Sequence, residues 1–131
     1  MKTNRYILIG LALTALAVVL AACGGGGSAA PTAPPVPAGD AVKGKAVFEG
    51  TCYSCHGIDA KGLPGLGKDM TTSEFIKGLS DADFVAFIKT GRPTSDPANT
   101  TGVDMPPKGG NPALTDEDLA NVVAYIRTLA E

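Results

Sequence analysis

The feature that most constrains this chain is a short motif at residues 52–56, which read Cys-Tyr-Ser-Cys-His. The pattern C-x-x-C-H is typical of the covalent attachment of a c-type haem. Cys52 and Cys55 can each form a thioether with one vinyl group of the porphyrin, and His56 then lies under the iron as the proximal ligand. We therefore predict that the chain folds around one covalently bound haem c.

Other uses of such a motif fit this chain less well. A thioredoxin-like redox pair needs a βαβ context, and none is visible in the sequence. A zinc site needs four ligands, whereas the chain has three cysteines and one histidine. One of those cysteines is assigned to a lipid below, so haem attachment is the preferred interpretation.

Residues 1–22 are expected to be a lipoprotein signal peptide that is removed. Lys2 and Arg5 give a positive start, residues 6–20 are an apolar run, and small residues follow, which is typical of a secretory signal. Residues 20–23, Leu-Ala-Ala-Cys, resemble the lipobox of bacterial lipoproteins, so we expect lipid attachment at Cys23. An uncleaved signal anchor, or a plain signal peptide with a coincidental cysteine, is the alternative.

Residues 23–38 are expected to be the lipid-anchored cysteine followed by a flexible linker rich in Gly, Pro and Ala, without apolar periodicity. Each buried CH₂ of an acyl chain contributes about 0.8 kcal/mol, so two or three chains anchor a protein stably. The prediction is a domain held at the extracytoplasmic face of a bacterial membrane. The linker lets this domain move over the surface, or is merely a spacer.

Residues 39–131 are expected to form one small domain with a thin core. Aromatic residues make up 5% of the chain and tryptophan is absent, so the haem would supply apolar bulk. The chain has 11 basic and 13 acidic residues, and loss of Lys2 and Arg5 leaves nine against 13, a net charge of −4. With no basic stripe, the domain is not expected to bind nucleic acid.

Local sequence signals predict an all-α domain with long loops. Asp40 is expected to cap a helix that runs to about Gly50, with Gly44 and Phe48 on one face. Thr72 is expected to cap a short helix that follows it. No strand alternation competes with these patterns.

Two further helices are predicted from capping-box patterns. Ser80 is followed three residues later by Asp83, and Thr115 by Asp118. Gly91 stands where a glycine ends the first of these helices. The second carries apolar residues at helical spacing to near the C-terminus.

The second axial ligand of the iron is expected to be Met105. His56 is the only histidine, so two histidine ligands from this chain are excluded. Met105 precedes two prolines, which forbid helix and hold an extended loop. Met70 is the alternative, although methionine is also a common core residue. A lysine, a water molecule or an open position remains as a third possibility.

Together these features resemble the class I monohaem cytochrome c family over residues 39–131. The resemblance implies a small all-α fold in which the terminal helices cross near Gly44, Phe48 and Tyr125, with long loops around the haem. It also implies that the Pro64 carbonyl accepts a hydrogen bond from Nδ1–H of His56. The alternative is that Pro64 is a simple turn residue. The residues that carry it are Gly44 to Phe48, 52–57, Pro64, Met105-Pro106-Pro107 and Tyr125-Ile126-Arg127.

Basic residues near the expected loops suggest two further roles. Arg92 is a candidate partner for a haem propionate, because guanidinium binds carboxylate bidentately; a solvated surface arginine is the alternative. Lys61, Lys68 and Lys108 flank these loops and are candidates for docking an acidic partner, although scattered lysines are usually solvated.

These features predict a one-electron carrier, not an enzyme, with His56 and Met105 as axial ligands. The family resemblance implies a quinol-oxidising complex as donor and an oxidase, reductase or photosynthetic reaction centre as acceptor, in a respiratory or photosynthetic chain. The alternative is a fixed monohaem subunit of a larger membrane complex, such as alternative complex III. A haem enzyme or gas-binding protein is disfavoured, because no second histidine is present and Met105 should close the site.

Overall fold

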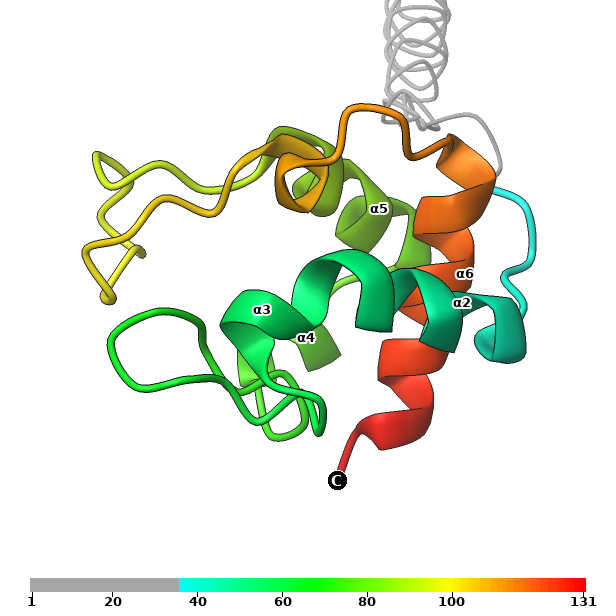
Figure 1. The fold of residues 1–131 in the computed structure, drawn as a ribbon, viewed down its shortest axis with the longest axis horizontal. Coiled ribbons are helices and arrows are strands. Elements are labelled where there is room, and N and C mark those ends of the chain that lie inside the picture. The colour runs from blue at the N-terminus through cyan, green and yellow to red at the C-terminus, as the bar shows by residue number, and fades with distance from the viewer. Residues whose placement is uncertain (1–35) are drawn as a thin grey trace, which may run out of the picture. The chain divides into compact units, whose positions relative to one another are not determined.

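The computed structural model describes residues 36–131, so the predicted signal peptide, Cys23 and most of the linker lie outside the described residues. Within residues 36–131 every regular element is a helix, which confirms the predicted all-α class (Figure 1). No helix in this range is both long and apolar enough to cross a membrane. The elements are α2 (Ala41–Val47), η2 (Phe48–Cys52), α3 (Tyr53–His56), α4 (Glu74–Lys77), α5 (Asp81–Thr90), η3 (Pro107–Gly110) and α6 (Asp116–Leu129).

The elements α2, η2 and α3 follow one another without a break from Ala41 to His56. Asp40 caps this segment as predicted, because its carboxylate accepts hydrogen bonds from two backbone N–H groups of the first turn. The expected end near Gly50 is wrong: the chain continues through a π-helical turn, and Gly57, with φ 73°, ends it. A glycine inside a helix costs only about 1 kcal/mol, which tertiary packing easily offsets.

Helix α2 crosses α6 at very short range (Figure 1). A Cβ atom on Gly44 would lie 1.9 Å from the backbone oxygen of Asn121, so this approach requires glycine. Phe48 is fully buried beside the crossing, and its ring centroid lies 5.5 Å from that of Tyr125. The Asn121 side chain also accepts a 2.7 Å hydrogen bond from the backbone N–H of Asp40. The predicted crossing of the terminal helices is therefore confirmed.

Helices α5 and α6 begin where the capping patterns predict. The Ser80 hydroxyl accepts a 3.1 Å hydrogen bond from the backbone N–H of Asp83. Thr115 and Asp118 form the complete reciprocal capping box at the start of α6. Gly91, with φ 72°, follows the last residue of α5, as expected of a C-terminal glycine.

Helix α4 begins one residue later than predicted. Its cap is Ser73, whose hydroxyl accepts a 3.4 Å hydrogen bond from the backbone N–H of Ile76. The Thr72 hydroxyl instead points to Asp69 and donates a 3.0 Å hydrogen bond to its carboxylate. The prediction of Thr72 as the cap is therefore wrong.

The core lies where α2, α5 and α6 pack together. It is small, which agrees with the low aromatic content of the sequence. Its largest fully buried side chains are Phe48, Phe84, Leu119, Ile126, Val122 and Val123.

Candidate functional site

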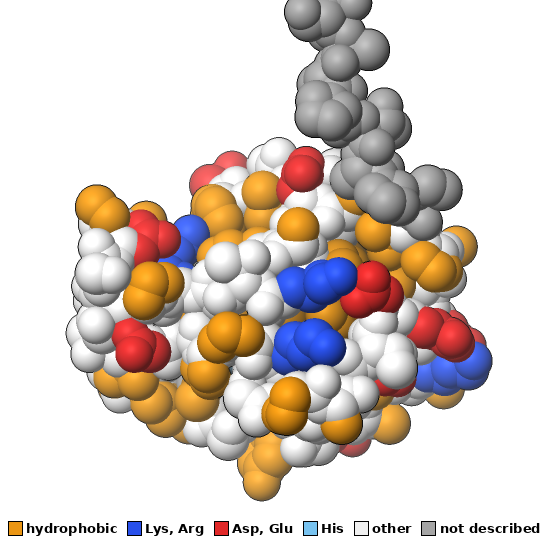
Figure 2. All heavy atoms as spheres, turned by 90° about the horizontal axis from the view of Figure 1, so that it is seen from above, with side chains coloured by type: hydrophobic (Ala, Val, Ile, Leu, Met, Phe, Trp, Pro, Cys, Tyr) orange, Lys and Arg blue, Asp and Glu red, His pale blue; other side chains and the backbone are white. Residues whose placement is uncertain are grey.

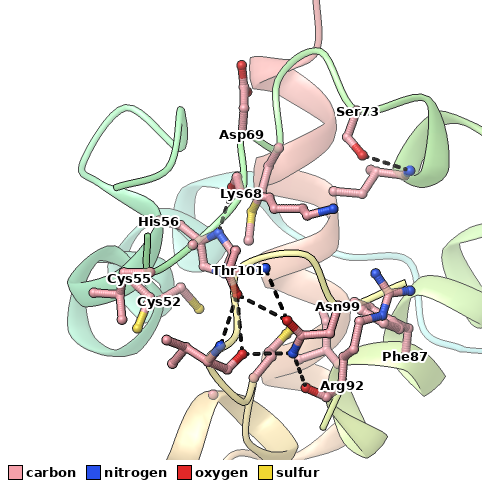
Figure 3. Close-up of a pocket in the computed structure, with 18 of the residues that line it drawn as sticks. Cys52, Cys55, His56, Lys68, Asp69, Ser73, Phe87, Arg92, Asn99 and Thr101 are labelled. Carbon is pink, nitrogen blue, oxygen red and sulfur yellow. Dashed lines mark hydrogen bonds between the residues drawn. The ribbon is translucent and has the colours of Figure 1, made fainter. Parts of the chain in front are cut away.

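An open cavity lined mainly by apolar side chains lies beside this core, with contributions from helices and loops (Figure 3). We call Cys52, Cys55, His56 and residues 66–70 the His56 wall, and Arg92 with residues 98–101 and 103–106 the Met105 wall. Side chains of α4, α5 and α6 complete the cavity. These are Phe75, Ile76, Phe84, Phe87, Ile88, Val122 and Ile126.

The three chemically active residues of the motif line this cavity together, as Figure 3 shows for the end of α3. Cys52, Cys55 and His56 are spaced i, i+3 and i+4, so a helical backbone brings them to one face. Both cysteines are free thiols and form no disulfide. The helix therefore presents two thiols and one imidazole to the same space.

A backbone carbonyl orients the imidazole of His56. Nδ1 lies 2.9 Å from the carbonyl oxygen of Lys68. Because a carbonyl only accepts, Nδ1 carries the proton and Nε2 keeps its lone pair for a metal. Burial lowers the pKa of His56, against an opposing effect of this hydrogen bond, so the ring is neutral at neutral pH. A neutral, oriented imidazole is what iron ligation requires.

The acceptor expected from the family resemblance was the carbonyl of Pro64, and this expectation is wrong. Pro64 is exposed and does not line the cavity. It occupies the second position of a turn closed by a 3.0 Å hydrogen bond from Leu66 N–H to the Leu63 carbonyl. Gly65 follows with φ 68°, as a Pro-Gly turn requires. The turn directs Pro64 to solvent, which leaves Lys68 as the acceptor.

The loop behind the motif packs directly on its backbone. Gly62 N–H donates to the His56 carbonyl at 2.7 Å, and Leu63 N–H donates to the Cys55 carbonyl at 3.1 Å. A Cβ atom on Gly67 would lie 2.3 Å from the Cys55 carbonyl oxygen and 3.2 Å from Nδ1 of His56. Sequence reasoning did not identify Gly67 or Lys68 as site residues. The only signal was the density of glycine in residues 62–67.

Cys52 does not behave as a catalytic thiolate. Burial, with a smaller effect of the neighbouring Cys55, raises the pKa of the Cys52 thiol to about 11. The Cys52 thiol is therefore protonated and a poor nucleophile at neutral pH. This excludes a redox-active pair with a lowered pKa at Cys52.

Met105 lines the cavity from a loop and is partly buried. An isolated antiparallel bridge ties its backbone to Arg92: Arg92 N–H donates to the Met105 carbonyl at 2.8 Å, and Met105 N–H donates to the Arg92 carbonyl at 2.9 Å. Pro106 is extended, as predicted. Pro107, expected to continue the extended loop, instead is the first residue of the short turn η3, in which Lys108 and Gly109 have positive φ.

Residues 41–130 match the family model described as Cytochrome c. The chain belongs to the cytochrome c family. It is 34% identical over 88 residues to cytochrome c-555 of Chlorobaculum thiosulfatiphilum, covering 66% of this chain and 93% of that protein. It is 36% identical over 99 residues to cytochrome c-554(547) of Halothiobacillus neapolitanus, covering 70% and 99%.

A third relative of this cytochrome is part of a larger protein. The chain is 31% identical over 90 residues to the Cbb3-type cytochrome c oxidase subunit CcoP of Rhodobacter capsulatus, covering 68% of this chain and 29% of that protein. No solved structure matches the chain significantly. The family and its single-haem members confirm the predicted class I monohaem cytochrome c and its covalent haem c cofactor.

The residues that line the cavity of this cytochrome fit that cofactor. Within residues 36–131 no group of three or more His, Cys, Asp or Glu side chains is arranged to hold a bare metal ion. The cavity instead offers two free thiols, an imidazole with Nε2 available, a thioether and an apolar lining. This donor set suits an apolar porphyrin that carries its own iron.

Two of the three lysines considered for docking are engaged in the folded cytochrome. Lys61 forms a 3.2 Å ion pair with Glu131. The Lys108 ammonium donates to the backbone carbonyls of Pro112 and Leu114 at 3.2 and 2.7 Å. Figure 2 shows basic and acidic side chains interspersed on one face of the molecule. No basic docking patch is evident on that face.

Proposed function

We propose that this cytochrome c is a membrane-anchored one-electron carrier in which Cys52 and Cys55 attach the haem and His56 and Met105 are its axial ligands. The observation that carries the proposal is that His56, with Nε2 available, and Met105 line one apolar cavity together with two free thiols. When bound, the haem supplies an Fe(III)/Fe(II) couple.

The protein side chains have three tasks in this proposal. The backbone carbonyl of Lys68 accepts the hydrogen bond of His56 Nδ1–H, which keeps the imidazole ring in one orientation. Met105 offers a soft thioether, which favours Fe(II) and so raises the potential. The apolar lining limits access of water, and a dry site favours the less charged reduced state.

Met105 is a better axial ligand than Met70 for a structural reason. Met70 is 8% exposed and belongs to the buried core cluster, and its backbone N–H is bonded to the Ala60 carbonyl at 2.8 Å. Both methionines line the cavity. Removing Met70 from its packing contacts would cost stability, whereas Met105 is only partly buried.

Replacement of each methionine tests the ligand assignment. A thioether ligand to low-spin ferric haem gives a weak red absorption band, so Met105→Ala should abolish the band, lower the potential and open the iron to carbon monoxide. Met70→Ala is the matched control and should keep the band. A band that survives Met105→Ala and disappears in Met70→Ala would reverse the assignment. Ready binding of carbon monoxide by the unaltered protein would favour an open site.

Anchoring rests on Cys23 and places the domain at the extracytoplasmic face of a bacterial membrane. The proposal is supported by the lipobox resemblance of residues 20–23. Cys23→Ala should block lipid attachment and correct cleavage of the signal peptide, and mass spectrometry of the unaltered mature protein should show acyl chains on Cys23. A mature protein that begins at Cys23 without acyl mass would contradict the anchor.

The proposed donor is a quinol-oxidising complex, and the acceptor is an oxidase, a reductase or a reaction centre. A fixed subunit of a larger complex is the second candidate, favoured by the similarity to a protein named as an oxidase subunit. Purification from membranes in mild detergent separates the two. A free haem protein supports the mobile carrier, and stoichiometric co-elution with a complex supports the fixed subunit.

A further inference from the structure

Arg92 is a long cationic side chain that lies largely out of solvent beside the apolar cavity. Its side chain is 17% exposed. Burial of a charge is costly unless it is compensated. Its Nε donates a 3.1 Å hydrogen bond to the Asp96 carboxylate. Its guanidinium carbon lies 4.6 Å from the ring centroid of Phe75 and 4.8 Å from that of Phe87. Arg92 is therefore not a solvated surface arginine.

The aromatic contacts attach Arg92 to the helical part of the domain. Phe75 belongs to α4 and Phe87 to α5. The two rings also contact each other edge to face, with centroids 5.1 Å apart. Figure 3 shows Arg92 beside Phe87 at the cavity. The guanidinium is thus held by Phe75, Phe87 and Asp96. We call these three residues the Arg92 clamp.

The backbone of the same residue holds Met105. The two bridge hydrogen bonds between Arg92 and Met105, 2.8 and 2.9 Å long, are the only backbone hydrogen bonds of Met105 within the described residues. Asn99 supports the bridge, because its side-chain amide donates to the carbonyls of Arg92 and Val103 at 3.5 and 2.8 Å. The backbone of Met105 is therefore tied directly to Arg92.

We propose that Arg92 is a positioning residue for Met105: the clamp fixes Arg92, and the bridge passes this restraint to the loop that carries the thioether. The proposal rests on Met105 being the axial ligand. The clamp limits how often the loop opens and the thioether leaves the iron. A role of Arg92 in binding a haem propionate is the competing explanation.

The test measures how fast imidazole binds to the ferric holoprotein, because an external ligand enters only when the thioether has left. Arg92→Lys keeps the charge but loses the planar guanidinium that bonds Asp96 and contacts both rings. Phe75→Leu leaves Arg92 in place and removes one ring. Each variant should bind imidazole roughly three- to tenfold faster and weaken the red band.

Arg127→Lys is the matched control. Arg127 also contacts an aromatic ring, that of Phe84 at 5.5 Å, and bonds to Asp81, but it does not line the cavity. This variant should lose stability and keep the imidazole rate of the unaltered protein. An equal acceleration in Arg127→Lys would mean general loosening and would overturn the proposal.

The remaining outcomes separate this proposal from the assignment of the ligand. If Met105→Ala abolishes the red band but neither clamp variant changes the imidazole rate, Arg92 is not a positioning residue and the ligand assignment stands. A changed potential with an unchanged rate in Arg92→Lys would support the propionate role instead. If Arg92→Lys fails to bind haem, Phe75→Leu decides, since Phe75 is 44% exposed and its loss is mild. If the band survives Met105→Ala, both proposals fail.

Discussion

The haem-attachment motif in the His56 wall lies at the end of a helix, whereas Met105 in the opposite wall lies on a loop. His56 ends a helical segment that starts at Ala41 and crosses α6, and two further backbone hydrogen bonds from residues 62 and 63 hold the motif. Met105 has one backbone bridge and the side-chain clamp of Arg92. A ligand on a packed helix moves only when much of the domain unfolds, while a ligand on a loop can leave by local opening. Substitutions that affect the His56 wall should therefore change the stability of the domain, whereas substitutions that affect the Met105 wall should change mainly the position of Met105.

The largest effect should come from the helix crossing that supports the His56 wall. Gly44→Ala places a Cβ atom 1.9 Å from the Asn121 backbone oxygen, so it should lower the free energy of unfolding by about 3 kcal/mol or more. Gly50→Ala is the control on the same helical segment, with no atom within 4 Å of its Cβ. It should be neutral or stabilising by up to about 1 kcal/mol. Denaturant unfolding of both variants measures the difference, and equal stabilities would contradict the importance of the crossing.

A smaller and more local effect is expected at the Met105 wall. Gly91 has φ 72°, and a Cβ atom there would lie 2.2 Å from the Met105 carbonyl oxygen. Gly91→Ala should therefore displace the Met105 loop, so that haem stays attached but the red band is lost or strongly reduced. Absorption spectra of the ferric protein check this.

Gly102→Ala is the matched control for this change. Gly102 has nearly the same φ, 73°, with no atom within 4 Å of its Cβ. The backbone strain of about 1–2 kcal/mol is thus shared by the two variants, but the contact with Met105 is not. Gly102→Ala should keep the band. Loss of the band in both variants would mean that strain anywhere in the loop is sufficient, and that the bridge has no special part.

The smallest effect should be electrostatic and should concern the His56 wall. The Asp69 carboxylate, next to Lys68, accepts hydrogen bonds from the backbone N–H and hydroxyl of Thr71, both at 2.7 Å, and these lower its pKa below its ordinary value of 3.8. A lowered folded-state pKa contributes stability that is present above 3.8 and is lost as the pH falls through the folded value.

Asp69→Asn should therefore reduce stability at about pH 7 and make the decline of stability below about pH 4 shallower. Urea midpoints at neutral and acid pH measure this. Parallel pH profiles for the variant and the unaltered protein would show that Asp69 does not contribute. If Asp69→Asn lost stability at acid pH only, the result would be opposite to the prediction.

Features that depend on neighbouring residues could be predicted from the sequence. Ser80 and Thr115 cap their helices as expected, because a capping hydroxyl bonds to a backbone group three residues away. The face shared by Cys52, Cys55 and His56 follows from helical spacing alone. The crossing at Gly44 was implied by family resemblance and is explained by the absence of a Cβ atom.

Predictions failed where a contact, either local or tertiary, outweighed the sequence signal on which the prediction was based. Gly50 was expected to end a helix, but the chain continues past it through a π-helical turn in which Phe48 is buried against Tyr125. Thr72 was expected to cap α4, but Asp69 engages its hydroxyl. Pro64 was expected to bond His56, but its turn faces solvent, and the Lys68 carbonyl is the acceptor. A backbone carbonyl leaves no mark in the side-chain sequence, so Lys68 had no signal of its own.

The sequence by itself determined the chemistry of this cytochrome and the start of most of its helices, because thiols, imidazole and caps act within one helical turn. The tertiary structure alone decided how the ligands are held. The Lys68 carbonyl reaches His56 across 12 residues, and Arg92 is joined to Met105 by a bridge and to Phe75 by its side chain. Such contacts form only when distant segments meet in the folded chain, so neither composition nor spacing could reveal them.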